Sequence, residues 1–190
     1  MPYFAVGAGL YWFRNAWAAI VGYHLGILLI LKFAGYAAPR RFEFTWQALL
    51  FGFAGLSAGI LLFVVWPRIH MSPSLPQTLL GWGLTRNAWP VFIAYTALFN
   101  PALEELFWRG WLGSADSRPV WADAWFAGFH LVILAPFLPV LWLVIAFLVL
   151  TFTAWMWRQV TRRTDSLLPA ALFHLAADVS ILLIIVSEVS

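Results

Sequence analysis

The chain contains no cysteine and little charge. Without cysteine it can form no disulfide, no thiolate-ligated metal site and no cysteine nucleophile, although the compartment stays undetermined. Only 10% of its 190 residues are charged, whereas 63% are hydrophobic. A water-soluble domain of this size needs more polar surface. The composition therefore predicts a protein that is solvated mainly by lipid.

The basic residues are too dispersed for a nucleic-acid-binding surface. The 11 Lys and Arg give a net charge of +3, but they occur singly or in pairs between apolar runs. Such cations are typical of the connections between membrane spans, where they set the topology. We therefore expect the lipid bilayer, and not nucleic acid, as a partner. Met1 to Trp12 lacks a charged n-region and a cleavage-site pattern, so we expect no cleavable signal peptide there.

Apolar runs bounded by charges and prolines predict an all-α, polytopic transmembrane helical bundle. A span needs about 20 largely apolar residues, so the chain has room for about six. The predicted spans are Ala16 to Ala34, Trp46 to Trp66, Ala88 to Gly110, Val120 to Ala135, Pro139 to Trp157 and Ser166 to Val186. Pro2 to Phe13 is apolar but too short to cross, so we expect an N-terminal helix at the interface or packed on the bundle. Residues 1–190 are predicted to form a single integral membrane domain.

The connections between the predicted spans carry unequal numbers of basic residues. One side of the membrane would hold Lys32, Arg40, Arg41, Arg109, Arg118, Arg158, Arg162 and Arg163, and the other Arg14, Arg68 and Arg86. Because Lys and Arg accumulate on the cytoplasmic side, we expect the first side to be cytoplasmic and both termini to lie outside. The polar ends of the third, fourth and sixth spans would then converge near the cytoplasm.

The third predicted span carries three charged residues close together. A charge in hydrocarbon costs about 3 kcal/mol on the mildest scales, so each needs a partner or a function. Glu105 precedes Arg109 by four residues, which predicts a supporting salt bridge on one helix face. Glu104 is turned about 100° from Glu105 by the helical period, which makes it the candidate general base. Pro101, in the same run, is expected to kink or restart the helix.

The fourth and sixth predicted spans each carry a histidine. His130 follows Gly128, which would let another helix approach closely. His174 and Asp178 lie one turn apart, so that Asp178 can orient the imidazole ring. Peptide hydrolysis without a covalent nucleophile needs a water, a base and donors for the oxyanion. Glu104 with His130 would hold the water, and His174 would donate to the carbonyl oxygen.

These residues form three motifs, EExxxR, FxxxH and HxxxD, in that order. The set resembles the CAAX-protease and bacteriocin-processing family of glutamate-type intramembrane endopeptidases, over about Asn100 to Asp178. The resemblance implies a catalytic core at approximately residues 88–188 and no cofactor. It implies a peptide or protein substrate, lipidated or with a membrane-embedded terminus, such as a prenylated C terminus, a bacteriocin leader or a sorting tail. We expect a protein of a bacterial inner membrane, with its active site toward the cytoplasmic half.

The resemblance also assigns roles to single residues. It implies that Glu104 and His130 activate the water, and that His174 and Asp178 form the oxyanion side. The family more usually has asparagine at the position of Asp178. Because an ionised aspartate cannot donate a hydrogen bond, Asp178 would act through His174 or stay protonated.

Other interpretations of the same residues stay open. Two histidines with carboxylates are a plausible zinc ligand set, although HExxH is absent. Buried Glu, His and Asp also fit a proton-coupled transporter or a non-enzymatic scaffold. Gly55 to Gly59 matches both G-x-S-x-G and GxxxG, and a predicted helix favours the packing motif. His24 and His70 match no motif, so we interpret them as structural histidines outside the site.

Overall fold

A computed structural model describes residues 2–37 and 42–189 of the chain. Within these ranges every regular element is a helix, which confirms the predicted all-α class. In chain order they are α1 (Pro2–Gly7), the π-helical segment η1 (Ala8–Trp12), α2 (Ala16–Phe33), α3 (Trp46–Gly55), α4 (Ser57–Ile69), α5 (Leu75–Gly81), α6 (Ala88–Glu105), the π-helical segment η2 (Leu106–Trp111), α7 (Trp121–Leu134), α8 (Val140–Thr164) and α9 (Leu168–Val189). Arg40 and Arg41, which count toward the predicted cytoplasmic side, lie outside the described residues.

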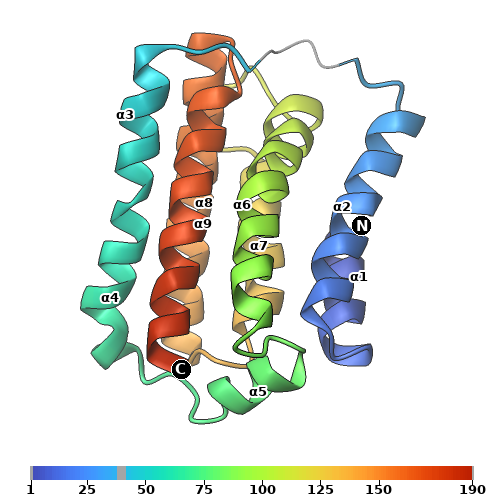
Figure 1. The fold of residues 1–190 in the computed structure, drawn as a ribbon. Helices are drawn as coiled ribbons and strands as arrows, with labels where there is room; N and C mark the ends of the chain where they lie inside the picture. Colours follow the sequence, from blue (N-terminus) through green and yellow to red (C-terminus); the bar gives the residue numbers. More distant parts are fainter. Residues whose placement is uncertain (1, 38–41, 190) are drawn as a thin grey trace.

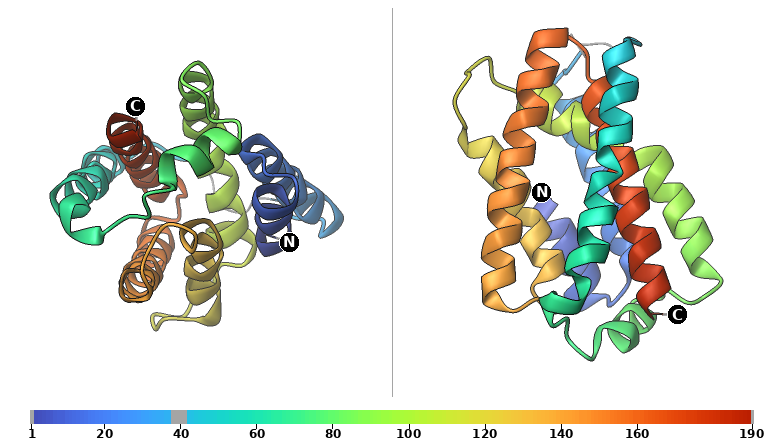
Figure 2. Two further views of the ribbon diagram at one scale, coloured as in Figure 1. Left: turned by 90° about the horizontal axis from the view of Figure 1, so that it is seen from below. Right: turned by 90° about the vertical axis from the view of Figure 1, so that its left-hand side faces the viewer.

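The long helices pack side by side in two layers (Figures 1 and 2). In Figure 1 the front layer runs from α3 and α4 through α9 and α6 to α2, with α7 and α8 behind it. The helix α9 contacts α3, α4, α6 and α8, while α7 contacts α8 and α1. The short helix α5, which the sequence pattern did not predict, lies at the lower end of the bundle. This arrangement places α9 directly beside α6.

Four helical runs among the described residues are long and apolar enough to span a membrane, namely Ala16–Phe33, Trp46–Ile69, Val140–Thr164 and Leu168–Val189. The predicted third and fourth spans do not meet this condition. The polar residues Asn100, Glu104 and Glu105 lower the hydropathy of α6, and α7 has only 14 residues. The chain is therefore a membrane protein that is all-helical, with four candidate spans, over the residues that the structure describes, and the predicted number of about six is not confirmed.

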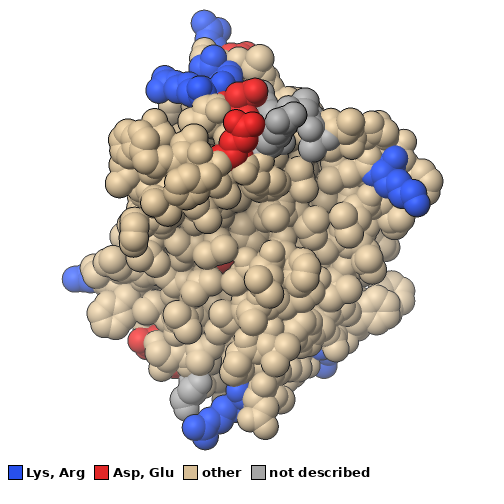
Figure 3. Space-filling model, turned by 45° about the horizontal axis from the view of Figure 1, so that its top comes forward, with Lys and Arg blue, Asp and Glu red and all other residues tan. Residues whose placement is uncertain are grey.

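The outer surface of the bundle is apolar. Only 17% of the most apolar part of Trp46–Ile69 and 11% of that of Val140–Thr164 is buried, although both are strongly hydrophobic. Phe33, Phe53 and Val140 are 83%, 70% and 76% exposed. On the face shown in Figure 3, the charged atoms gather mainly toward the upper and lower edges, and the band between them is largely uncharged. This distribution suits a surface covered by lipid.

The N-terminal segment packs on the bundle, which is one of its two predicted placements. The Tyr3 hydroxyl donates to the Trp125 carbonyl at 2.9 Å, and the Tyr11 hydroxyl donates to the Val132 carbonyl at 2.6 Å. Any side chain at Gly128 would collide with the hydroxyl of Tyr3. The close approach predicted at Gly128 is therefore made by α1.

Gly55 and Gly59 form a packing surface against α9. A Cβ atom at Gly55 would collide with the Phe173 carbonyl oxygen, and one at Gly59 would collide with the Ser180 side chain. Both glycines lie in the helical run of α3 and α4, so the strand and sharp turn of a nucleophile elbow are not formed here. The interpretation as a helix-packing motif is confirmed.

Candidate active site

The last turn of α6 and the segment η2 bring charged side chains into the interior. Of the two outcomes expected at Pro101, a kink or a restart, the restart does not occur, because α6 is continuous from Ala88 to Glu105. The backbone widens into the π-helical segment η2 after Glu105. Glu105 Oε1 accepts a hydrogen bond from Arg109 Nη1 at 3.1 Å, and these side chains are 0% and 2% exposed. The predicted Glu105–Arg109 pair is therefore formed.

Aromatic rings from two other helices cover the guanidinium group of Arg109. Its Cζ atom lies 4.2 Å from the ring centre of Phe126 on α7 and 4.8 Å from that of Trp157 on α8. Each contact of this kind contributes about 0.5–2 kcal/mol. Arg109 thus joins η2 to α7 and α8 while it holds Glu105, which fits the predicted supporting role.

His174 lies between three carboxyl groups. Its Nδ1 is 3.2 Å from Glu105 Oε1, and its Nε2 is 3.5 Å from Asp178 Oδ2 and 3.8 Å from Glu104 Oε2. The contact with Asp178 was predicted from the spacing on α9, whereas the contacts with the two glutamates join α9 to α6. The ring also packs on Trp157, with the two ring centres 4.8 Å apart. His174 is therefore the residue that ties the first and third motifs together.

Glu104 is buried and incompletely paired. Its residue is 2% exposed, and its Oε2 has no hydrogen-bond partner among the residues that the structure describes. Tyr23 on α2 interacts with Glu104, and its hydroxyl accepts a hydrogen bond from Trp108 Nε1 at 3.0 Å. Glu105 Oε2 also lacks a partner among the described residues, but the other oxygen of Glu105 is held by Arg109 and His174, so Glu104 is the less committed of the two carboxyl groups.

His130 belongs to the same aromatic cluster on α7. Its Nδ1 lies 2.8 Å from the Phe126 carbonyl oxygen, which can only accept, so Nδ1 carries the hydrogen and Nε2 is an acceptor. The Phe126 ring contacts both His130 and His174, with ring-centre distances of 4.6 and 6.2 Å. No direct hydrogen bond joins Glu104 and His130 in the described structure. Their joint action on one water stays a prediction.

A second set of polar residues reaches the site from α2 and α6. Asn100 Nδ2 donates to Asp178 Oδ2 at 2.9 Å, and Asn100 Oδ1 lies 3.0 Å from His24 Nε2. His24 Nδ1 lies 2.9 Å from the Tyr95 hydroxyl. His24 is thus a hydrogen-bonded buried histidine, as expected, but it also contacts a side chain that holds Asp178. The available signal was that Asn100 precedes Glu104 by one helical turn in an apolar run.

A buried ion pair fixes the connection between η2 and α7. Arg158 on α8 is 1% exposed and donates to both carboxylate oxygens of Asp123, at 3.0 and 2.8 Å. It also donates to the Ser114 and Arg118 carbonyl oxygens at 3.3 and 2.7 Å. The sequence pattern placed Arg158 in a cytoplasmic connection. In the structure it is an internal clamp that sets the position of α7, and with it His130.

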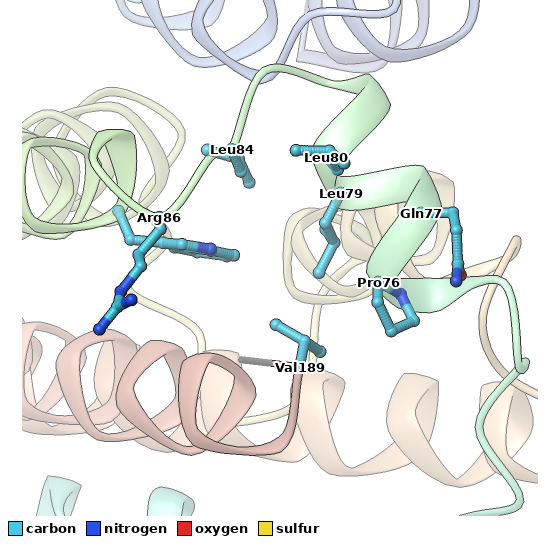
Figure 4. Close-up of a pocket in the computed structure, with 8 residues that line it drawn as sticks. Pro76, Gln77, Leu79, Leu80, Leu84, Arg86 and Val189 are labelled. Atoms are coloured by element: carbon cyan, nitrogen blue, oxygen red, sulfur yellow. The ribbon is translucent and has the colours of Figure 1, made fainter.

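Two pockets on the surface of the described structure are not lined by any residue of the cluster around His174. One, of about 450 Å³, lies beside α5 and is lined by Pro76, Leu79, Arg86 and Val189 among others (Figure 4). Among the described residues, no three His, Asp or Glu side chains have the arrangement of a metal site. The side chain of Asp178, at 22% exposed, is the most accessible part of the cluster around His174.

The fold and the cluster together define a class of protein. Buried carboxyl groups around one histidine, inside an all-helical membrane bundle, are the groups that water-activating hydrolysis within a membrane requires. The family model described as type II CAAX prenyl endopeptidase Rce1-like matches residues 86–180, or 95 of the 190 residues. The chain therefore belongs to the Rce1-like family, and all three motifs lie within the match. Neither the curated proteins nor the solved structures contain a match to the chain.

Proposed function

We propose that the protein is a glutamate-type intramembrane endopeptidase in which Glu104 deprotonates the attacking water. The observation that carries the proposal is the buried Oε2 of Glu104, which lacks a hydrogen-bond partner among the described residues and lies 3.8 Å from His174 Nε2. A general base needs an oxygen that is not already committed, with a donor nearby for the substrate carbonyl. Membership of a CAAX endopeptidase family supports proteolysis.

The proposed reaction uses one water and forms no covalent enzyme intermediate. Glu104 takes one proton from the water as the water oxygen bonds to the carbonyl carbon, and the O–H that remains on this oxygen donates a hydrogen bond to His130 Nε2. The carbonyl oxygen becomes an oxyanion, which receives a hydrogen bond from His174 Nε2. The C–N bond then breaks as Glu104 passes its proton to the leaving amine.

The surrounding charges would keep His174 in position during this reaction. Glu105 faces Nδ1 at 3.2 Å and is itself fixed by Arg109. Asp178 faces Nε2 at 3.5 Å. Each nitrogen thus meets a carboxylate oxygen, which only accepts, so the ring presents a hydrogen on Nε2. In this scheme Asp178 positions the imidazole before the substrate carbonyl oxygen reaches Nε2.

We infer a location in a bacterial inner membrane, with the site in the cytoplasmic half. Arg109 and Arg158 are buried in ion pairs, but the other basic residues still number six on the predicted cytoplasmic side against three on the other, which supports this orientation. Because the family is one of CAAX prenyl endopeptidases, a prenylated C terminus is the first substrate class to test. A bacteriocin leader and a C-terminal sorting tail are the other two classes.

The experiment compares protein termini in proteoliposomes. Purified protein is reconstituted with a membrane-protein extract and a farnesylated CAAX peptide, and new termini are identified by mass spectrometry. Glu104→Gln is the inactive variant, and Glu188→Gln, the same change at an exposed position on α9, is the control. We expect new termini with wild type and Glu188→Gln only. Equal sets of termini with all three proteins would refute the proposal.

The same preparation separates the two other interpretations. Cleavage that a zinc chelator abolishes and added zinc restores would establish the metalloprotease. The continuous chain of polar side chains from Tyr95 to Glu105 is the feature that a proton-coupled transporter would use. Proton-driven uptake by the reconstituted protein, without any cleavage, would support that function instead.

A further inference from the structure

Asn100 is held at the edge of the site by side chains from two other helices. Asp178 on α9 accepts a hydrogen bond from its Nδ2 at 2.9 Å, and His24 on α2 lies 3.0 Å from its Oδ1. Asn100 is 9% exposed and His24 is 3% exposed. Polar groups at this depth are costly and generally have a function. Neither residue has a role in the reaction described above.

The contacts allow only one orientation of the Asn100 amide. The amide nitrogen donates to Asp178 Oδ2, so the amide oxygen faces His24. That oxygen requires a hydrogen on Nε2 of His24. Nδ1 of the same ring then accepts from the Tyr95 hydroxyl, 2.9 Å away. The His24 ring, with its hydrogen on Nε2, therefore orients the Asn100 amide so that its nitrogen faces Asp178.

Two N–H donors from different helices converge on one oxygen. Asn100 Nδ2 lies 2.9 Å from Asp178 Oδ2, and His174 Nε2 lies 3.5 Å from the same atom. Asn100 is hydrogen-bonded to this oxygen, while His174 Nε2 is near it at a longer distance, and two N–H groups aimed at one point are what an oxyanion site requires. The Asp178 side chain is 22% exposed, against 3% for His174 and 2% for Glu104, so it is the group best able to turn outward.

We propose that Asn100 is the second hydrogen-bond donor to the oxyanion, beside His174, and that His24 is a positioning residue that aims its amide. In the resting protein Asp178 Oδ2 occupies the point where the donors meet, and the substrate carbonyl oxygen replaces it there. This inference rests on the proposed peptide hydrolysis and deepens it, because α6 then supplies both the base, Glu104, and one oxyanion donor, Asn100.

The test uses the full chain in liposomes and a fluorogenic peptide built on a cleavage site that the wild-type protein shows. Asn100→Leu removes the donor at similar volume, and Thr96→Val, a buried position one turn earlier on α6, is the matched control. We expect Asn100→Leu to lower kcat about 10²–10³-fold, as is usual for one oxyanion donor. KM should change less than about threefold, because the lost bond forms only in the transition state. A kcat for Asn100→Leu equal to that of Thr96→Val overturns the proposal.

A second pair of variants decides the question if Asn100→Leu does not fold. Asn100→Asp alone puts two carboxylates together, whereas Asn100→Asp with Asp178→Asn restores an amide–carboxylate contact and an N–H donor beside His174. We expect kcat of the double variant to exceed that of Asn100→Asp by at least about tenfold, which is part of the 10²–10³-fold effect that one oxyanion donor supplies. A pair as slow as the single variant overturns the role of Asn100.

The Glu104→Gln variant keeps the two proposals apart. If Glu104→Gln cleaves at the wild-type rate, the proposed function is wrong. If Glu104→Gln is inactive and Asn100→Leu keeps its full kcat, only the role of Asn100 is wrong. His24→Ala should lower kcat less than Asn100→Leu does, and His24→Gln, whose amide can still donate to Asn100, should restore part of the loss. Equal kcat for the two His24 variants would overturn the positioning role.

Discussion

Arg109→Met should destabilise the fold without removing any group that we place in contact with the substrate. The change leaves Glu105, which is 0% exposed, as a buried carboxylate without its guanidinium partner. Breaking a buried ion pair by removing one member costs about 3–5 kcal/mol. Methionine still fills much of the space between Phe126 and Trp157, so the loss should reflect the charge more than the packing. We therefore expect the free energy of unfolding to fall by about 3–5 kcal/mol.

The assay is unfolding in mixed micelles with increasing SDS, followed by tryptophan fluorescence. Arg68→Met, at an exposed position on α4, is the control and should change the free energy of unfolding by at most about 0.5 kcal/mol. Adding Glu105→Gln to Arg109→Met should recover at least about half of the loss, because no buried charge is then left unpaired. Glutamine still accepts from His174. An Arg109→Met protein as stable as Arg68→Met, or a double variant below the single one, would refute this reasoning.

Three further changes test the helix packing at Gly55, the internal clamp made by Arg158 and the role of His130. Gly55→Ala forces a methyl group against an α9 carbonyl and should cost about 1–3 kcal/mol of unfolding free energy, whereas Gly22→Ala, in open space, should cost nothing. Arg158→Met should raise amide hydrogen exchange in the connection between η2 and α7, and unchanged exchange would contradict the clamp. His130→Gln should lower kcat about 10²-fold or more, while His70→Gln, on a connection, should leave it unchanged.

Contacts within one helix were predictable from the sequence. The Glu105–Arg109 and His174–Asp178 pairs follow from a spacing of four residues, which the helical period alone brings together. The all-α class and the membrane setting follow from composition in the same direct way. Family membership was also accessible, because the three motifs keep their order and spacing whatever the tertiary packing.

Contacts between helices were not predictable in the same way. The approach of Glu105 to His174, and that of Asn100 to Asp178, depend on α6 lying beside α9, which no local spacing encodes. The sequence analysis placed His24 outside the site for the same reason, since its contact with Asn100 joins α2 to α6. The predicted number of about six spans is not confirmed, because polar side chains lower the hydropathy of α6 and because α7 has only 14 residues.

The central claim is that Glu104 is the base, and it predicts a separation of activity from stability. In liposomes, with the fluorogenic peptide, Glu104→Gln should lower kcat by about 10²–10⁴-fold, the range for a lost general base. Its unfolding free energy should match that of Glu188→Gln, because Oε2 of Glu104 has no hydrogen bond to lose within the described residues. A Glu104→Gln protein that cleaves as fast as Glu188→Gln would contradict the account.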